Sequence, residues 1–201
     1  MNTYTVKKVC GTPDWSTVPV LHMEHRYNET PANLSASAQI AYDAEQLWVH
    51  LMSDETDLRI QESGPIARTW EDSCLEFFFC PLPGDSRYFN IEMTANCSLY
   101  LGVGPGDRNK RLRLLPKDPA TVLSQRANIT DKGWELFYTV PFSLIRGLFP
   151  EFRAESGMAL RANCYKCGDL TEKPHYLSWN PVASATPDFH RSCDFGTMIL
   201  E

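Results

Sequence analysis

Carboxylate, amide and guanidinium side chains alternate with apolar ones in three short segments, residues 73–80, 88–94 and 158–165. Since residues i and i+2 share a face of a β-strand, each segment places polar side chains on one face and apolar ones on the other. The polar side chains are those of Glu76, Asn90, Glu92, Arg161 and Asn163. In neighbouring strands they would form one patch beside aromatic rings, which suits a hydroxyl-rich ligand. A solvated outer face with an Arg161–glutamate ion pair fits the same periodicity.

The same carboxylates could perform acid–base chemistry, because hydrolysis of a glycosidic bond uses two carboxyl groups. Glu71, Asp72, Glu76 and Glu92 supply such groups. That reaction needs one carboxyl with a raised pKa and another that stays ionised. The sequence shows no feature that would separate two pKa values, and Arg161 on the same face would favour ionisation of both. We therefore expect binding without catalysis.

Metal and haem sites have weaker support in the sequence. Cys164 and Cys167 have C-x-x-C spacing, but residues three apart in a strand face opposite sides, and Cys193 with His190 could complete a zinc set only if the closing loop folds back. The oxygen-rich run at 54–57 allows a structural calcium ion, although a solvated turn explains it equally well. The Met and His pairs at 23/25 and 50/52 are too close together to be the two axial ligands of a haem.

Length and composition indicate one globular domain spanning residues 1–201. The chain is 43% hydrophobic and 22% charged, with a net charge of −6, so nucleic acid and anionic membranes are not expected partners. The one basic run, 108–117, predicts a solvated strand face. Seven cysteines and the lack of an export signal or a membrane-spanning run predict a reducing, cytoplasmic location, or an extracellular one if a native leader is missing from this sequence.

Period-two alternation predicts an all-β fold, an antiparallel β-sandwich of jelly-roll or immunoglobulin-like type. The expected strands are residues 3–9, 18–27, 37–43, 47–53, 73–80, 88–94, 98–103, 122–129, 134–140, 158–165, 175–179 and 196–200. One short helix is expected at 141–149, where a proline begins an apolar stripe.

Several motifs recur in the order of one known family. Residues 68–79 read Arg-Thr-Trp-Glu-Asp-Ser-Cys-Leu-Glu-Phe-Phe-Phe, 88–92 read Tyr-Phe-Asn-Ile-Glu, a tryptophan strand at 133–140 runs into a proline-initiated helix, and 177–180 and 189–196 close the pattern. Together with the return strand at 157–163, these segments resemble family 9 carbohydrate-binding modules over most of the chain. Such modules are β-sandwiches related to DOMON-type sugar- or haem-binding domains, and they bind glucan or xylan chain ends or small sugars between two aromatic rings.

The resemblance implies roles for individual residues. Trp70 matches the first clamp aromatic, and Phe189 stands where the family often has a second tryptophan. Glu76, Asn90, Glu92, Arg161 and Asn163 match positions that hydrogen-bond sugar hydroxyls. Phe189 in place of tryptophan and Ser192 in place of proline depart from the family pattern, which puts ligand type and affinity in doubt.

The expected ligand is therefore a carbohydrate, bound non-catalytically, in a protein that could accompany glycoside hydrolases. The alternative is a structural or protein-interaction sandwich without a ligand, in which the aromatic residues near Trp70 would pack inward.

Overall fold

The computed structural model describes residues 1–27 and 30–201, and it is built almost entirely of β-strands. The strands are β1 (Thr3–Lys8), β2 (Leu21–His22), β3 (His25–Arg26), β4 (Ala36–Tyr42), β5 (Gln46–Ser53), β6 (Cys74–Cys80), β7 (Tyr88–Thr94), β8 (Leu99–Gly104), β9 (Leu112–Leu114), β10 (Arg126–Thr130), β11 (Gly133–Pro141), β12 (Ala159–Gly168), β13 (His175–Ser178) and β14 (Gly196–Leu200). The α-helix α1 spans Phe142–Leu148, and 3-10 turns occur at η1 (Trp15–Thr17), η2 (Thr69–Glu71), η3 (Arg108–Lys110) and η4 (Ser192–Asp194).

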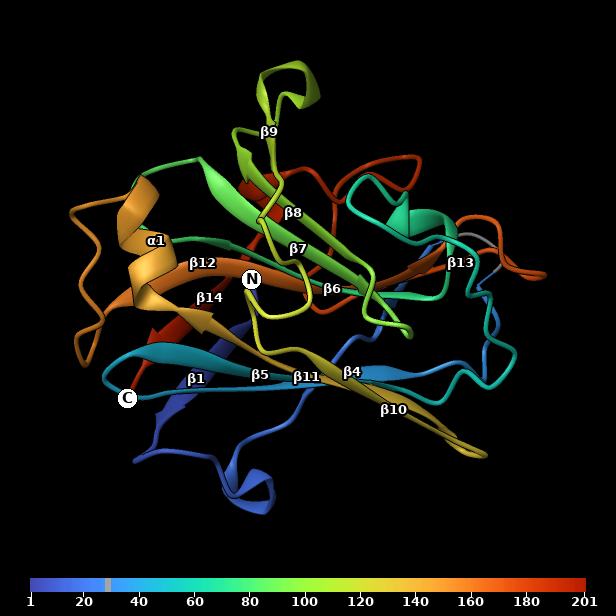
Figure 1. Cartoon of the computed structure of the whole chain (residues 1–201), viewed down its shortest axis with the longest axis horizontal. Helices are drawn as coiled ribbons and strands as arrows, with labels where there is room; N and C mark the ends of the chain where they lie inside the picture. Colours follow the sequence, from blue (N-terminus) through green and yellow to red (C-terminus); the bar gives the residue numbers. More distant parts are fainter. Residues whose placement is uncertain (28–29) are drawn as a thin grey trace.

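The strands form one curled sheet with the order β10-β11-β5-β4-β1-β14-β12-β6-β7-β8-β9. Its two halves face each other as two layers, with β12, β6, β7 and β8 above β5, β11, β4 and β10 in the view of Figure 1. Strand β1 joins the layers, because its first residues pair with β14 and Lys7 and Lys8 pair with β4.

The prediction of a mostly β fold with one short helix is confirmed, but the strictly antiparallel sheet is wrong. Strand β1 runs parallel to both of its neighbours. Alternation of side chains predicts that a strand exists but carries no information about its direction relative to a partner far along the chain. The segment expected at 18–27 is two short strands, and the one expected at 122–129 begins only at Arg126.

Apolar residues fill the space between the layers. The inward faces of β6 and β7 contribute Phe77, Phe79, Phe89 and Ile91, each with no exposed surface, to one large cluster. Helix α1 adds Phe142 and Ile145 at the end of the sandwiched core, as the predicted stripe requires. None of the helices in the described part of the chain is long and apolar enough to cross a membrane.

A second apolar cluster lies on the outer face of the β12-β6-β7 layer. It contains Phe78, Tyr88, Tyr165, Phe189 and Phe195. Phe78 lies on β6, Tyr88 on β7 and Tyr165 on β12. The other two rings belong to the segment that crosses this face between β13 and β14, here called the covering chain (orange to red in Figure 1). The outer face is therefore partly covered, and what is left open is the candidate site.

Candidate functional site

A cavity of about 450 Å³ opens on the outer face of the β6-β7-β8 layer. Its volume falls in the range of about 300–1,000 Å³ that is typical of sites for small molecules. Strands, the η2 turn and the covering chain all contribute to its lining. The lining residues are Trp70, Glu76, Glu92, Tyr100, Arg111, Arg113, Cys167, Asp169, Tyr176, Pro187, Phe189 and His190.

Two glutamates form the floor of the cavity. Glu76 on β6 lies directly opposite Glu92 on β7, and Glu92 lies opposite Tyr100 on β8. Glu92 is fixed by two neutral donors: the Thr69 hydroxyl donates to Oε2 at 2.9 Å, and the Asn90 amide donates to Oε1 at 2.7 Å. Both carboxyl groups are only 3% exposed, so their charges are largely removed from solvent.

The pKa values of these two groups are raised to different extents. Burial and the negative charge of Glu92 hold the pKa of Glu76 well above its ordinary value. Burial also raises the pKa of Glu92, but the hydrogen bonds from Asn90 and Thr69 and the charges of two nearby arginines oppose that rise. Glu76 is therefore the group of the pair that binds a proton more readily. The expected effect of Arg161 on both carboxyls is wrong, because its guanidinium donates instead to the Cys193 and Phe195 carbonyls at 2.9 Å.

Aromatic rings form the walls. The Trp70 ring is half-buried at the rim and meets Tyr100 edge to face, with ring centroids 5.9 Å apart and planes at 72°. Phe189 is only 8% exposed and stacks on Tyr165, with centroids 4.1 Å apart and planes at 11°. The Tyr176 and Phe189 rings are arranged edge to face, with centroids 6.3 Å apart and planes at 73°. Trp70 is thus an accessible stacking surface, whereas Phe189 belongs mainly to the packed wall.

Backbone contacts fix the position of Trp70. The Trp70 carbonyl accepts a hydrogen bond from the Asp169 amide at 2.9 Å, and the Glu71 carbonyl accepts one from the Leu170 amide at 3.1 Å. Asp72, with no exposed surface, accepts hydrogen bonds from the Gln61 and Glu62 amides and from the Arg59 guanidinium. These contacts hold the η2 turn where it presents the indole, and the Asp72 carboxylate helps to fix this segment.

Two arginines from the basic run complete the cavity. Arg111 lies over the Tyr88 ring at 4.1 Å from the centroid, and Arg113 lies over the Tyr100 ring at 4.3 Å. Arg111 also donates to the Gly104 and Pro105 carbonyls. The prediction of a wholly solvated face for this run is therefore wrong, because β9 turns alternate arginines back over the aromatic rings of β7 and β8.

Four of the seven predicted site residues line this cavity: Trp70, Glu76, Glu92 and Phe189. Asn90 lies beneath it with no exposed surface and links Glu92 to Arg111. Asn163 and Arg161 share the same face of the sheet but do not line the cavity. Asn163 instead bonds the Asn180 backbone, donating to its carbonyl at 3.0 Å and accepting from its amide at 2.8 Å.

Several lining residues were missed by reasoning from the sequence. Tyr100 could have been found, since it lies on a predicted strand two residues from Ser98 and faces the same side as Glu92. Pro187 and His190 carry no local signal of their position, because the path of the chain after β13 places them there. Tyr176 lies on β13, and the pairing of that strand with β12 brings it to the cavity. Cys167 was missed because β12 continues past the predicted end of that strand at residue 165.

The oxygen-rich run at 54–57 lines a smaller cavity of about 190 Å³. The Asp54 carboxylate accepts from the Ser35 amide and hydroxyl, and the Glu55 carboxylate is ion-paired with Lys166 at 2.8 Å. These internal partners leave few carboxylate oxygens of this run for a calcium ion, so the residues present do not favour one there.

Comparison with known proteins places the chain among carbohydrate-binding modules. The family model described as carbohydrate-binding family 9 matches residues 14–200. A solved structure of a proposed carbohydrate-binding protein from Bacteroides uniformis is 27% identical, with a TM-score of 0.85 and 99% of each chain covered. A family 9 module from Caldicellulosiruptor kristjanssonii matches in complexes with cellotriose (10% identity, 100% of this chain and 94% of that one) and glucose (11%, 100% and 96%), each with a TM-score of 0.70, and shares the fold. No curated protein matches the chain.

Proposed function

The chain belongs to carbohydrate-binding family 9, and we propose that it binds a pyranose ring, at a chain end or as a small free sugar, in the cavity beside Trp70. The cavity places fixed carboxyl and guanidinium groups beside exposed aromatic surface. The solved modules in complex with cellotriose and glucose share the fold, which supports this class of ligand. The two facing layers likewise support the sandwich part of the expected fold class.

The observation that carries the proposal is the combination of the two glutamates with Trp70 in one opening. The Glu92 carboxyl accepts hydrogen bonds from sugar hydroxyls, and Glu76, whose pKa is raised more strongly, can both donate and accept when it is protonated. Arg111 and Arg113 also line the cavity and add positive charge to it. A sugar ring has hydroxyls around its edge and C–H groups on its faces, so the polar floor and the indole satisfy different parts of the same ligand.

The geometry does not suit glycoside hydrolysis. The two carboxyl groups of a glycosidase flank the scissile bond from different sides. Glu76 and Glu92 are cross-strand neighbours, so both reach the ligand from one side, the floor. Glu92 is also held in place by Thr69 and Asn90. Separate pKa values alone therefore do not make this a catalytic pair, and the protein binds without turnover.

The expected affinity is modest. Covering one face of an indole with the C–H groups of a sugar contributes on the order of 1–2 kcal/mol. Ordering of the ligand and desolvation of its hydroxyls offset much of the remaining interaction. We expect dissociation constants from micromolar to millimolar.

Calorimetric titration with cellobiose, xylobiose and glucose tests the proposal. We compare the wild type with Trp70→Ala and with Trp48→Ala, a matched control on β5 whose half-buried indole donates to Asp43 and does not line the cavity. Trp70→Ala should weaken binding about tenfold or more, which is about 1.4 kcal/mol, whereas Trp48→Ala should leave it unchanged. Equal affinities for the wild type and Trp70→Ala, or no binding of any of the sugars by the wild type, would refute the site.

A further inference from the structure

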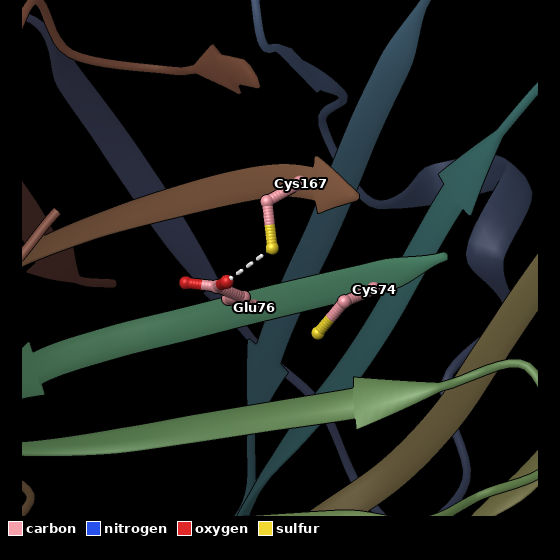
Figure 2. A group of neighbouring side chains, drawn as sticks. All are labelled: Cys74, Glu76 and Cys167. Atoms are coloured by element: carbon pink, nitrogen blue, oxygen red, sulfur yellow. Dashed lines mark hydrogen bonds between the residues drawn. The ribbon is translucent and has the colours of Figure 1, made fainter. Parts of the chain in front are cut away.

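Two cysteines and a glutamate meet beside the cavity, and two of them, Glu76 and Cys167, line it. Cys74 and Glu76 lie two residues apart on β6 and share its outer face, and Cys167 on β12 lies directly opposite Cys74 (Figure 2). The Cys167 thiol donates to Glu76 Oε1 at 2.8 Å. The two sulfur atoms and a carboxylate oxygen all lie within 4.8 Å of one another, and all three residues are buried. Within the described part of the chain, no other group of three or more His, Cys, Asp and Glu side chains converges in this way.

We propose that Cys74, Cys167 and Glu76 form a binding site for a thiophilic divalent cation of the zinc class, with a fourth coordination position open to the cavity. Two sulfur ligands select zinc-like ions over calcium or magnesium, which prefer oxygen. Ligand atoms around tetrahedral zinc are roughly 3.5 Å apart, so side-chain adjustments of about 1 Å would close this set around one ion. Glu76 and Cys167 line the cavity, so water can occupy the fourth position.

Metal binding at this site must displace the protons of all three groups. Burial raises the pKa of Cys74 to about 11 and raises that of Glu76 as well. When a divalent cation enters, two thiol protons and one carboxyl proton leave, and the resulting complex carries one net negative charge. Lys166 contributes a positive charge that favours the ionised forms of Cys74 and Glu76, while Glu92 and Asp169 oppose it.

A disulfide between Cys74 and Cys167 is the competing use of the two sulfurs. Both uses require deprotonated thiols, so the raised pKa values of the two cysteines do not favour one over the other. A disulfide would, however, leave the Glu76 carboxyl without the thiol that now donates to it. The metal site uses all three groups, whereas the disulfide uses two and isolates the third.

Titration of the full chain with Co²⁺ and then Zn²⁺, without sugar and with a non-thiol reductant, tests the site. The background variant Cys10→Ser/Cys193→Ser removes the two exposed thiols. We expect one Co²⁺ per chain with thiolate-to-metal absorption in the near ultraviolet, its displacement by Zn²⁺, and a rise in Tm on adding Zn²⁺. Cys74→Ser and Cys167→Ser should each weaken binding about a hundredfold or more, and Glu76→Gln should weaken it less.

Cys97→Ser provides the matched control, since Cys97 is a half-buried thiol outside the cluster. Circular dichroism identifies any variant that fails to fold, and Glu76→Gln then gives an independent reading that removes no cysteine. The proposal is overturned if the background variant binds no metal, if binding survives in folded Cys74→Ser, or if thiol titration shows Cys74 and Cys167 already joined as a disulfide. The measurement needs no sugar, so its failure leaves the proposed carbohydrate site standing, and the reverse also holds.

Discussion

Lowering the pH from about 7 to about 4.5 should destabilise the protein through His175. His175 is 3% exposed and lies in a buried network at the end of β12. Its Nδ1 is 2.9 Å from the Lys173 carbonyl, and its Nε2 is 2.6 Å from the Lys166 ammonium, which is itself ion-paired with Glu55 at 2.8 Å. Neutral imidazole satisfies both contacts, because Nδ1–H donates to the carbonyl and Nε2 accepts from the ammonium. A protonated ring would place one cation against another, and the Glu55 carboxylate, 3.5 Å from Nε2, offsets this repulsion only in part.

The magnitude follows from the pKa. Burial, together with the charge of Lys166, lowers the pKa of His175 from 6.5 to about 4. Between these values the unfolded chain binds a proton that the folded protein does not, so stability is complete above pH 6.5 and is lost as the pH falls toward 4. The full difference corresponds to on the order of 3 kcal/mol, of which most should be lost by about pH 4.5.

Urea unfolding at several pH values measures this loss. Between pH 7 and pH 4.5 the free energy of unfolding of the wild type should fall relative to that of His175→Asn, although the stability of His175→Asn at pH 7 will be lower. The raised pKa values of Glu76 and Glu92 act in the opposite direction, and they do so equally in both proteins. The free energy of unfolding of His175→Asn should still depend on pH to some extent, because burial also lowers the pKa of His50. His22→Asn, at an exposed histidine, should behave like the wild type. If His175→Asn keeps the full wild-type slope, the buried network does not control the acid stability.

Three further substitutions test the site and its walls. Gly102→Ala should cost about 1–3 kcal/mol of stability and weaken sugar binding, because the added Cβ falls on the Asn90 amide that positions the floor; urea unfolding and calorimetry check both. Arg111→Met should weaken sugar binding about tenfold by calorimetry, whereas Lys117→Met, an exposed position of the same basic run, should not. Phe189→Ala should destabilise by about 3–5 kcal/mol, because this ring is packed and nearly buried; a loss below about 1 kcal/mol would instead make it a free clamp.

Strand periodicity predicted the floor of the site correctly because it is a local property. Glu76 and Glu92 lie on strands whose bounds differ by at most one residue from those expected, 73–80 and 88–94. Two-residue alternation fixed which side chains share a face, and the register then placed the two carboxyls opposite each other. The separation of their pKa values could not be predicted, since it depends on Thr69 and on arginines from other parts of the chain.

The direction of β1 and the role of the basic run depend on contacts between distant segments. Lys7 pairs with Ala41, and Thr3 pairs with Thr197, so the parallel arrangement is set by both ends of the chain. Arg113 looks like a solvated residue in the sequence because it belongs to the basic run at 108–117. Its guanidinium nonetheless packs on Tyr100, since β9 pairs with β8 in a register that no local pattern shows.

The covering chain between β13 and β14 decides which part of the polar face stays open. It bonds Asn163 through the Asn180 backbone and Arg161 through the Cys193 and Phe195 carbonyls, so both side chains are used to attach the cover. The same chain supplies Phe189 to the wall above the two glutamates. The polar face therefore has two parts. Arg161 and Asn163 hold the covering chain, whereas Glu76 and Glu92 line the cavity that this chain helps to enclose. Polar side chains on one face of a sheet can bind a common ligand only where their donors and acceptors are not already bonded to another segment of the protein.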